Sequence, residues 1–231
     1  MQKLAIYDMD RTITRSGTYT PFLLQMVLAR APWRLLLAPF TLLGFAAYGL
    51  KLTGRKGLKT WNQRLLLGSS PSLEKLQPHI ERFADRTLRD NSLASAISQL
   101  EEDRKEGRTL VLATASYELY VEAIARRLDI PHVIATRLKI TESGAVLPRI
   151  IGENCYDSAK LERITAWLEE QGLNRTELHI RAYSDHVSDA PMLQFADEAV
   201  ATTPSPALRR LATERGWKIV DWSQSQTSPS A

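Results

Sequence analysis

Two aspartates, Asp8 and Asp10, stand two residues apart at the end of the short apolar run KLAIYD (3–8). Two like charges at the end of a core strand are costly to bury unless other groups neutralise them. Other polar side chains stand in comparable places, after strand-length apolar runs or at the start of a helical stretch: Thr114, Ser116, Lys160, Asp185 and Asp189. Carboxylates can stay ionised together where a divalent cation and a lysine offset their charge. These residue types therefore predict a site for a divalent cation.

Five apolar runs of strand length predict the elements that position these groups, at residues 3–8, 109–114, 132–136, 178–185 and 198–202. Around the later runs, apolar residues at helical spacing predict helices at 91–106, 116–128 and 158–172. Asn91 is the expected N-cap of the first of these helices. A segment centred on Glu-Ser-Gly, 137–148, predicts a β-hairpin. Strands that alternate with helices indicate an α/β fold with a Rossmann-like parallel sheet covered on both faces. Ligands of such sheets bind outside the carboxyl ends of the strands, so the polar groups should converge on one crevice.

A long segment between the first two strands interrupts this alternation. Strand signals stop there, and the pattern is typical of helices broken by Pro32, Pro39 and Gly54. A crossover between parallel strands needs only a dozen or more residues, so the surplus indicates a helical cap over the strand ends. The chain should thus divide into three parts. The core comprises residues 1–16 and 91–222, and the helical cap inserted after the first strand comprises residues 17–90. A disordered tail follows at residues 223–231.

The composition is that of a globular protein, with 231 residues, 44% of them hydrophobic, and a net charge of +4. Cys155 is the single cysteine, so no internal disulfide can form and a reducing, cytoplasmic location is expected. The net charge is too mild to indicate a nucleic-acid partner. Its distribution is uneven, because nine basic residues and no acidic residue lie between Asp10 and Glu74. This excess favours an anionic substrate or surface.

The order and spacing of the polar residues resemble the haloacid dehalogenase (HAD) superfamily over residues 4–220. Asp8-Met9-Asp10-Arg11-Thr12 resembles its DxDxT signature, Thr114 its second motif and Lys160 its third, and Asp185-x-x-x-Asp189 resembles its fourth. The helical insertion between the first two motifs is similar to the subclass that includes phosphoserine phosphatase. The resemblance implies a Mg²⁺-dependent phosphatase with a Rossmann-like core.

The resemblance also implies roles for the catalytic and metal-binding residues. Asp8 would be the nucleophile that forms an aspartyl-phosphate. Mg²⁺ would be held by Asp8, by Asp185 and by the main-chain carbonyl of Asp10, whose side chain would act as general acid and base. Thr114 and Lys160 would donate hydrogen bonds to the phosphoryl oxygens.

The remaining polar residues would support that site. Asp189 would orient Lys160 or a metal-bound water. Ser116 and Arg11 are candidates for substrate binding, although Ser116 could equally be the N-cap of the next helix. His186 lies inside the fourth motif, either as a surface histidine or as a titrating group beside the metal.

The substrate is expected to be an anionic phosphomonoester, lipid-linked in one interpretation. In phosphoserine phosphatases a glutamate nine positions after the nucleophile holds the substrate ammonium, and this chain has Gly17 there. No acidic residue occurs anywhere in 11–73, which is unfavourable for an amino-acid zwitterion. Three alternatives stay open: a phosphoserine phosphatase-type enzyme for small metabolites, a phosphate-binding regulatory protein without turnover, and phosphotransfer to an acceptor other than water.

An uncharged, mostly apolar run at 35–50 is too short to cross a bilayer as a helix. It has two interpretations. One is a buried cap helix pair or an oligomer interface, and the other is a hairpin that lies peripherally on the inner face of an anionic membrane with its basic flanks on the headgroups. The run also resembles the cap of bacterial phosphatidylglycerophosphate phosphatases of the same superfamily.

Overall fold

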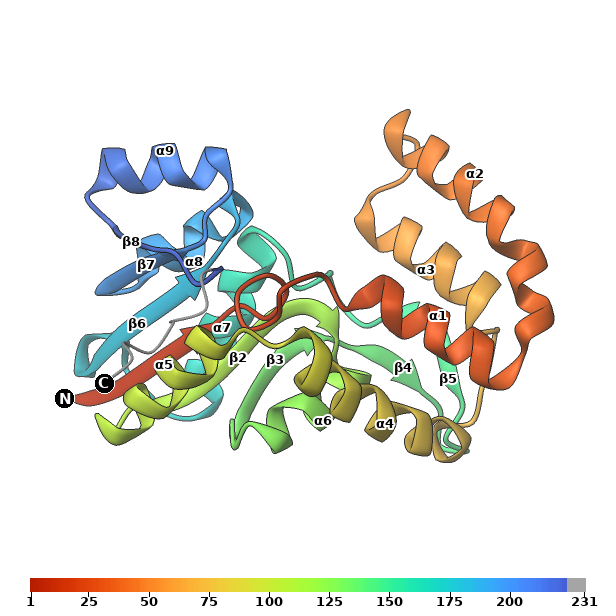
Figure 1. The fold of residues 1–231 in the computed structure, drawn as a ribbon, viewed down its shortest axis with the longest axis horizontal. Coiled ribbons are helices and arrows are strands. Elements are labelled where there is room, and N and C mark those ends of the chain that lie inside the picture. The colour runs from red at the N-terminus through yellow and green to blue at the C-terminus, as the bar shows by residue number, and fades with distance from the viewer. Residues whose placement is uncertain (224–231) are drawn as a thin grey trace, which may run out of the picture.

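A computed structural model describes residues 1–223 of the chain (Figure 1). The expected disordered tail at 223–231 lies outside the described residues, except for Ser223. Six parallel strands form the main sheet in the order β3-β2-β1-β6-β7-β8. They are β1 (Gln2–Tyr7), β2 (Thr109–Tyr117), β3 (His132–Thr136), β6 (Leu178–Ser184), β7 (Glu198–Thr202) and β8 (Lys218–Val220). The predicted α/β fold with a parallel sheet is confirmed, and the sequence missed only the short edge strand β8.

The sheet is covered on both faces, which is why its central strands are continuously apolar. Leu4 and Ile6 of β1 face one buried cluster, and Ala5 and Tyr7 face the other. The first cluster includes residues of α7 (Ser158–Glu170), α8 (Ala190–Phe195) and α9 (Pro206–Arg215). The second includes residues of α5 (Ala94–Lys105) and α6 (Glu118–Arg127). The two-residue period of a strand therefore fixes β1 between two layers of helices.

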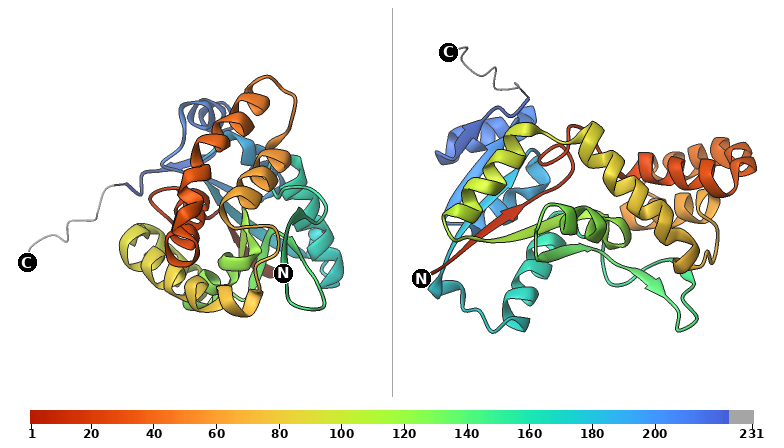
Figure 2. Two further views of the ribbon diagram at one scale, coloured as in Figure 1. Left: turned by 90° about the vertical axis from the view of Figure 1, so that its right-hand side faces the viewer. Right: turned by 60° about the horizontal axis from the view of Figure 1, so that its bottom comes forward.

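The segment between β1 and β2 forms helices, as predicted. In order they are α1 (Tyr19–Arg30), the 3-10 helix η1 (Pro32–Leu37), α2 (Ala38–Gly49), α3 (Arg55–Leu66), α4 (Leu73–Asn91) and α5. Figure 2 shows α1 to α3 gathered at one end of the molecule, beyond the sheet. Helix α4 runs back to the core and contacts α6, where Arg127 forms ion pairs with Glu81 and Asp85.

The predicted β-hairpin is confirmed as β4 (Leu138–Ile140) and β5 (Val146–Ile150), which pair in antiparallel fashion. It joins the start of α4, because Leu73 N donates to Gly144 O and Val146 N donates to Pro71 O, both at 2.8 Å. The hairpin therefore ties the inserted helices to a second part of the core.

The expected N-cap role of Asn91 is wrong. Asn91 is the last residue of α4, and α5 begins three residues later with Leu93 at the N-cap position. The Asn91 side chain instead accepts hydrogen bonds from the backbone N and the hydroxyl of Ser16, at 3.1 and 3.0 Å. The amide is therefore used to hold the loop after β1 against the end of α4, a contact between distant parts of the sequence.

The interpretation of residues 35–50 as a buried helix pair is also wrong. The run splits into part of η1 and all of α2, and Gly44 is the only buried residue of α2. No residue of η1 is buried. Among residues 1–223, no helix is both long enough and apolar enough to cross a membrane. The cytoplasmic location stays a prediction.

Candidate active site

The carboxyl ends of β1, β2 and β6 meet the start of α7 around a cavity of about 270 Å³. Seven of its lining residues come from the sequence prediction: Asp8, Asp10, Arg11, Thr114, Lys160, Asp185 and Asp189. The other lining residues are Arg55, Ala115, Tyr156, His186 and Ser188. Residues more than 150 positions apart in the chain therefore share one cavity, because parallel strands place their carboxyl ends on the same edge.

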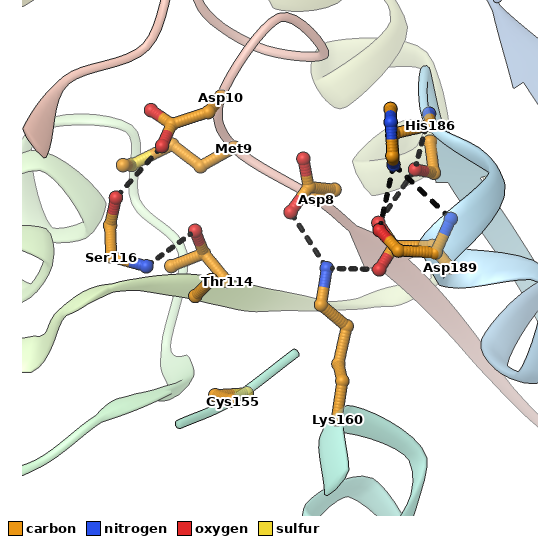
Figure 3. A network of polar contacts seen from close by, with 12 residues as sticks. Asp8, Met9, Asp10, Thr114, Ser116, Cys155, Lys160, His186 and Asp189 are labelled. Atoms are coloured by element: carbon orange, nitrogen blue, oxygen red, sulfur yellow. Dashed lines mark hydrogen bonds and ion pairs between the residues drawn. The ribbon is translucent and has the colours of Figure 1, made fainter. Parts of the chain in front are cut away.

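Lys160 lies at the centre of the charged groups (Figure 3). Its side chain is 2% exposed, and its Nζ lies 2.8 Å from Asp8 Oδ1 and 2.8 Å from Asp189 Oδ1. It shares the buried face of α7 with Ile164 and Leu168, at helical spacing. Burial opposes the charge on the ammonium, but Asp189 and Asp8 together raise its pKa well above the ordinary value. Lys160 is therefore a buried cation held between two carboxylates.

Asp8 directly follows β1, and its backbone N donates to Tyr183 O at 3.0 Å, which continues the pairing of β1 with β6. Burial raises the pKa of the Asp8 carboxyl to about 8, while Lys160 acts in the opposite direction. Oδ1 accepts a hydrogen bond from Lys160 at 2.8 Å. A divalent cation near this carboxyl would lower its pKa again and keep it ionised.

The Asp10 carboxylate is held away from Lys160 by two hydroxyl groups. Its Oδ1 accepts hydrogen bonds from the backbone N and the hydroxyl of Thr18, at 2.9 and 2.7 Å, and its Oδ2 accepts one from Ser116 Oγ at 2.9 Å. Figure 3 shows the side chain turned toward Ser116. Thr18 stands at the N-cap position of α1, so the first cap helix begins at the residue that fixes Asp10.

Thr114 and Ser116 both belong to β2, which continues as far as Tyr117. Ser116 does not line the cavity but contacts Asp10, and the N-cap position of α6 belongs to Tyr117. The N-cap alternative for Ser116 is therefore wrong, while its role in substrate binding stays a prediction. Thr114 lines the cavity, and its Oγ1 accepts a hydrogen bond from Ser116 N at 3.2 Å.

The fourth motif forms a short 3-10 helix, η3 (Val187–Asp189), after β6. Asp189 Oδ2 accepts a hydrogen bond from Ser184 Oγ at 2.7 Å, while its other oxygen faces Lys160. His186 stands at the N-cap position of η3, where its Nδ1 accepts a hydrogen bond from Ser188 N at 3.2 Å. Because Asp189 is fixed by Ser184 and contacts Lys160 through its other oxygen, its position suits the predicted role of orienting Lys160.

Asp185 and Asp8 supply the oxygen donors that Mg²⁺ prefers. Asp185 is 6% exposed, and burial together with the charge of Asp189 raises the pKa of its carboxyl to about 6, against the opposite effect of Arg11. Within residues 1–223, no side chain donates a hydrogen bond to the Asp185 carboxyl, and none forms an ion pair with it. A backbone hydrogen bond and the charge of Arg11 only partly offset the burial of this carboxyl, and a bound cation would offset it further.

The described residues contain no cluster of three or more His, Cys, Asp or Glu side chains arranged to hold a metal ion. Two carboxylates and the main-chain carbonyl of Asp10 would therefore need water and phosphate oxygens to complete the octahedral shell of Mg²⁺. That sharing is the usual arrangement for Mg²⁺ at phosphate sites. The donor set fits the ion in chemistry, and Asp8, Asp10 and Asp185 would be its protein ligands.

Two basic residues of the cap reach the site and were not singled out from the sequence. Arg55 lines the cavity, with its guanidinium carbon 3.9 Å from the centroid of the Tyr156 ring. Lys59, one turn further along α3, donates to Ala115 O at 2.6 Å and to Asn154 Oδ1 at 2.8 Å, and burial lowers its pKa to about 8. The only sequence signal was the general basic character of the cap, which does not tell inward from outward side chains.

A parallel sheet with a buried lysine and several carboxylates at its carboxyl edge, and with helices inserted after β1, defines a Rossmann-like α/β protein with a charged site under inserted helices. Residues 5–194 match the family model described as haloacid dehalogenase-like hydrolase, and the chain belongs to this family. The predicted family and enzyme class are thus confirmed.

Relatives include phosphatases with two different named substrates. The chain is 35% identical over 126 residues to the phosphoserine phosphatase SerB1 of Mycobacterium tuberculosis. The matched region covers 54% of this chain and 39% of that protein. The chain is 28% identical over 150 residues to a histidinol-phosphatase of Neisseria meningitidis, covering 64% of this chain and 62% of that protein. The chain therefore spans less than two thirds of the length of both relatives.

One solved structure is similar over almost its whole length. It is a protein of unknown function from Bordetella pertussis, with a TM-score of 0.85 and 25% sequence identity. The similarity covers 96% of this chain and 99% of that chain, so it includes the inserted helices as well as the core.

Proposed function

We propose that the protein hydrolyses a small phosphomonoester with the help of Mg²⁺, by way of a phosphorylated Asp8. The observation that carries this proposal is Lys160, which is buried and paired with both Asp8 and Asp189 in the cavity that Asp185 also lines. A purely structural lysine at this place would not need a hollow beside it lined by further carboxylates and by Thr114.

In this proposal, an oxygen of Asp8 attacks phosphorus and the bond from phosphorus to the leaving oxygen breaks, while Asp10 gives the leaving oxygen a proton. Water then attacks the phosphorus of the aspartyl-phosphate, Asp10 takes a proton from it, and phosphate and free Asp8 result. Lys160 and Thr114 donate to the phosphoryl oxygens. Bound Mg²⁺ would offset the negative charge of the phosphoryl group.

The names of the relatives support the small-metabolite alternative better than the lipid-linked substrate that we expected first. The cavity volume of about 270 Å³ points the same way, since it is small among ligand sites. On the cap side its charged lining residue is Arg55, and residues 11–73 contain no carboxylate. We therefore propose a small leaving group that is anionic or neutral at the end that faces Arg55.

The test is turnover of p-nitrophenyl phosphate with Mg²⁺ and with EDTA, for the native chain and for Asp8→Asn. We expect EDTA to abolish turnover and Asp8→Asn to lower kcat roughly 10³-fold or more, because the amide is no nucleophile. Glu142→Gln, an exposed carboxyl on the hairpin, is the matched control and should keep full activity. Turnover that survives both EDTA and Asp8→Asn would contradict the mechanism.

A substrate panel then separates the alternatives. It contains O-phosphoserine, histidinol phosphate, glycerol 3-phosphate and lysophosphatidic acid in detergent, each with and without an added alcohol acceptor. A small-metabolite phosphatase prefers one of the first three, and a phosphotransferase turns over faster with the acceptor. A regulatory protein binds phosphate without turnover. The lipid arm is included because the cap exposes an extensive apolar surface.

A further inference from the structure

The outer part of the cap carries large apolar side chains that are at least half exposed. We call this set the apolar cap surface: Trp33, Leu36, Phe40, Leu42, Leu43, Phe45, Leu50 and Leu52. It extends over η1, α2 and the turn that leads to α3, at the end of the molecule furthest from the N-terminus (Figure 1). Soluble proteins rarely expose so many large apolar side chains together unless another surface covers them.

Helix α2 packs against α3 and η1, but these contacts bury little of its apolar sequence. It contains no charged residue, and it contacts α3 through one narrow side. A Cβ atom at Gly44 would lie 2.7 Å from Trp61 Cδ1, and Trp61 Nε1 donates to Phe40 O at 3.1 Å. The glycine therefore lets α2 approach α3 along one line, and most of its circumference stays exposed. A helix that is apolar nearly all round requires an apolar or interfacial environment.

The charged residues in the segment that carries this surface are all of one sign, and Lys56 of α3 pairs with Glu153 of the core at 2.9 Å. Residues 11–73 contain nine basic and no acidic residues. Lys51 is exposed in the turn between Leu50 and Leu52, and Arg64 is exposed on α3. A symmetric contact with a second copy would bring two such positive surfaces together, because an isologous interface pairs each patch with itself. An anionic bilayer offers the opposite charge and an apolar layer beneath it.

We propose that the apolar cap surface docks peripherally on a bilayer that contains anionic lipids, with η1 and α2 lying in the interface. Trp33 and Tyr48 suit this position, because aromatic side chains with one polar group favour the boundary between headgroups and acyl chains. Arg55, which lines the catalytic cavity, is only three residues beyond Leu52, so the cavity would lie close to the bilayer. This proposal does not depend on the catalytic one.

The experiment is sedimentation of the full chain with large unilamellar vesicles. Vesicles of phosphatidylcholine with phosphatidylglycerol are compared with vesicles of phosphatidylcholine alone, at low salt and at 0.5 M salt, a concentration at which the Debye length is only a few ångströms (~4 Å). We expect binding to the anionic vesicles at low salt, with a bound fraction that is several-fold lower on neutral vesicles. Absence of binding to anionic vesicles at low salt would overturn the proposal.

A matched pair of double variants tests the surface itself. Leu36→Asp with Leu42→Asp should lower the bound fraction at least tenfold, whereas Ile140→Asp with Ile151→Asp places the same charges on exposed apolar residues outside the cap and should bind as the native chain does. Equal binding by both double variants would overturn the assignment. Turnover of p-nitrophenyl phosphate should be the same in both, which separates this test from that of the catalytic mechanism.

Two further measurements identify the occupant. Addition of anionic vesicles should shift the tryptophan emission to the blue, and Trp33→Phe should remove most of that shift. Sedimentation velocity without lipid should give a monomer. A dimer that the Leu36→Asp with Leu42→Asp variant dissociates, with no vesicle binding by the native chain, would instead assign the surface to a second copy and overturn the proposal.

Discussion

Replacement of Asp185 by asparagine should stabilise the metal-free protein while it removes the Mg²⁺-dependent activity. Asp185 is 6% exposed, and burial and Asp189 raise the pKa of its carboxyl from 3.8 to about 6. A carboxyl whose pKa is higher in the folded than in the unfolded state binds more protons when folded, so stability falls as the pH rises through this window. The cost is absent below about pH 4 and complete above pH 6.

The size of the effect follows from the same two values. One pKa unit corresponds to about 1.4 kcal/mol, so a rise from 3.8 to about 6 costs the folded protein about 3 kcal/mol at neutral pH. The neutral amide of Asp185→Asn removes this cost, so the variant should gain up to about 3 kcal/mol at pH 7.5 in EDTA. Mg²⁺ at 100 times its Kd should add about 2.7 kcal/mol to the native chain and much less to the variant.

The assay is urea unfolding, followed by tryptophan fluorescence in EDTA at pH 7.5, 5 and 4, with Glu142→Gln as the exposed control. The gain of Asp185→Asn should shrink as the pH falls and vanish at pH 4. Its Mg²⁺-dependent turnover should fall roughly 100-fold or more. A variant no more stable than the native chain at pH 7.5, or a gain that persists at pH 4, would refute the reasoning.

Three further changes test other contacts. Lys160→Met leaves two buried carboxylates without their cation and should lower the free energy of unfolding in urea by roughly 3–5 kcal/mol. Adding Asp189→Asn to this variant should recover part of the lost stability, and no recovery would argue against the pairing. Gly44→Ala places a Cβ 2.7 Å from an indole carbon and should cost roughly 1–3 kcal/mol, while Gly49→Ala, with open space around it, should be neutral or better. Arg55→Met should lower kcat/KM for an anionic substrate roughly tenfold more than for p-nitrophenyl phosphate, and an equal loss would remove Arg55 from substrate recognition.

Local patterns in the sequence were sufficient to predict the sheet and the residues that gather at its edge. Apolar runs of strand length mark β1, β2, β3, β6 and β7, because strands buried on both faces must be apolar throughout. The exception, β8, is three residues long and none of them is buried, so it has no such signal. Once the strands are parallel, their carboxyl ends share one edge, and Asp8, Thr114 and Asp185 must lie near one another. Their individual catalytic roles stay predictions.

Only the tertiary structure decided which way particular side chains turn. The sequence marks Ser116 as a polar residue near the site, but its contact with Asp10 depends on how the loop after β1 lies against β2. Arg55 and Lys59 look like any other basic residues of the cap until the placement of α3 turns them toward the core. The apolar run at 35–50 has the composition of a buried helix, yet it is exposed. Composition records how apolar a segment is, whereas burial depends on which distant segments pack against it, and no local pattern contains that information.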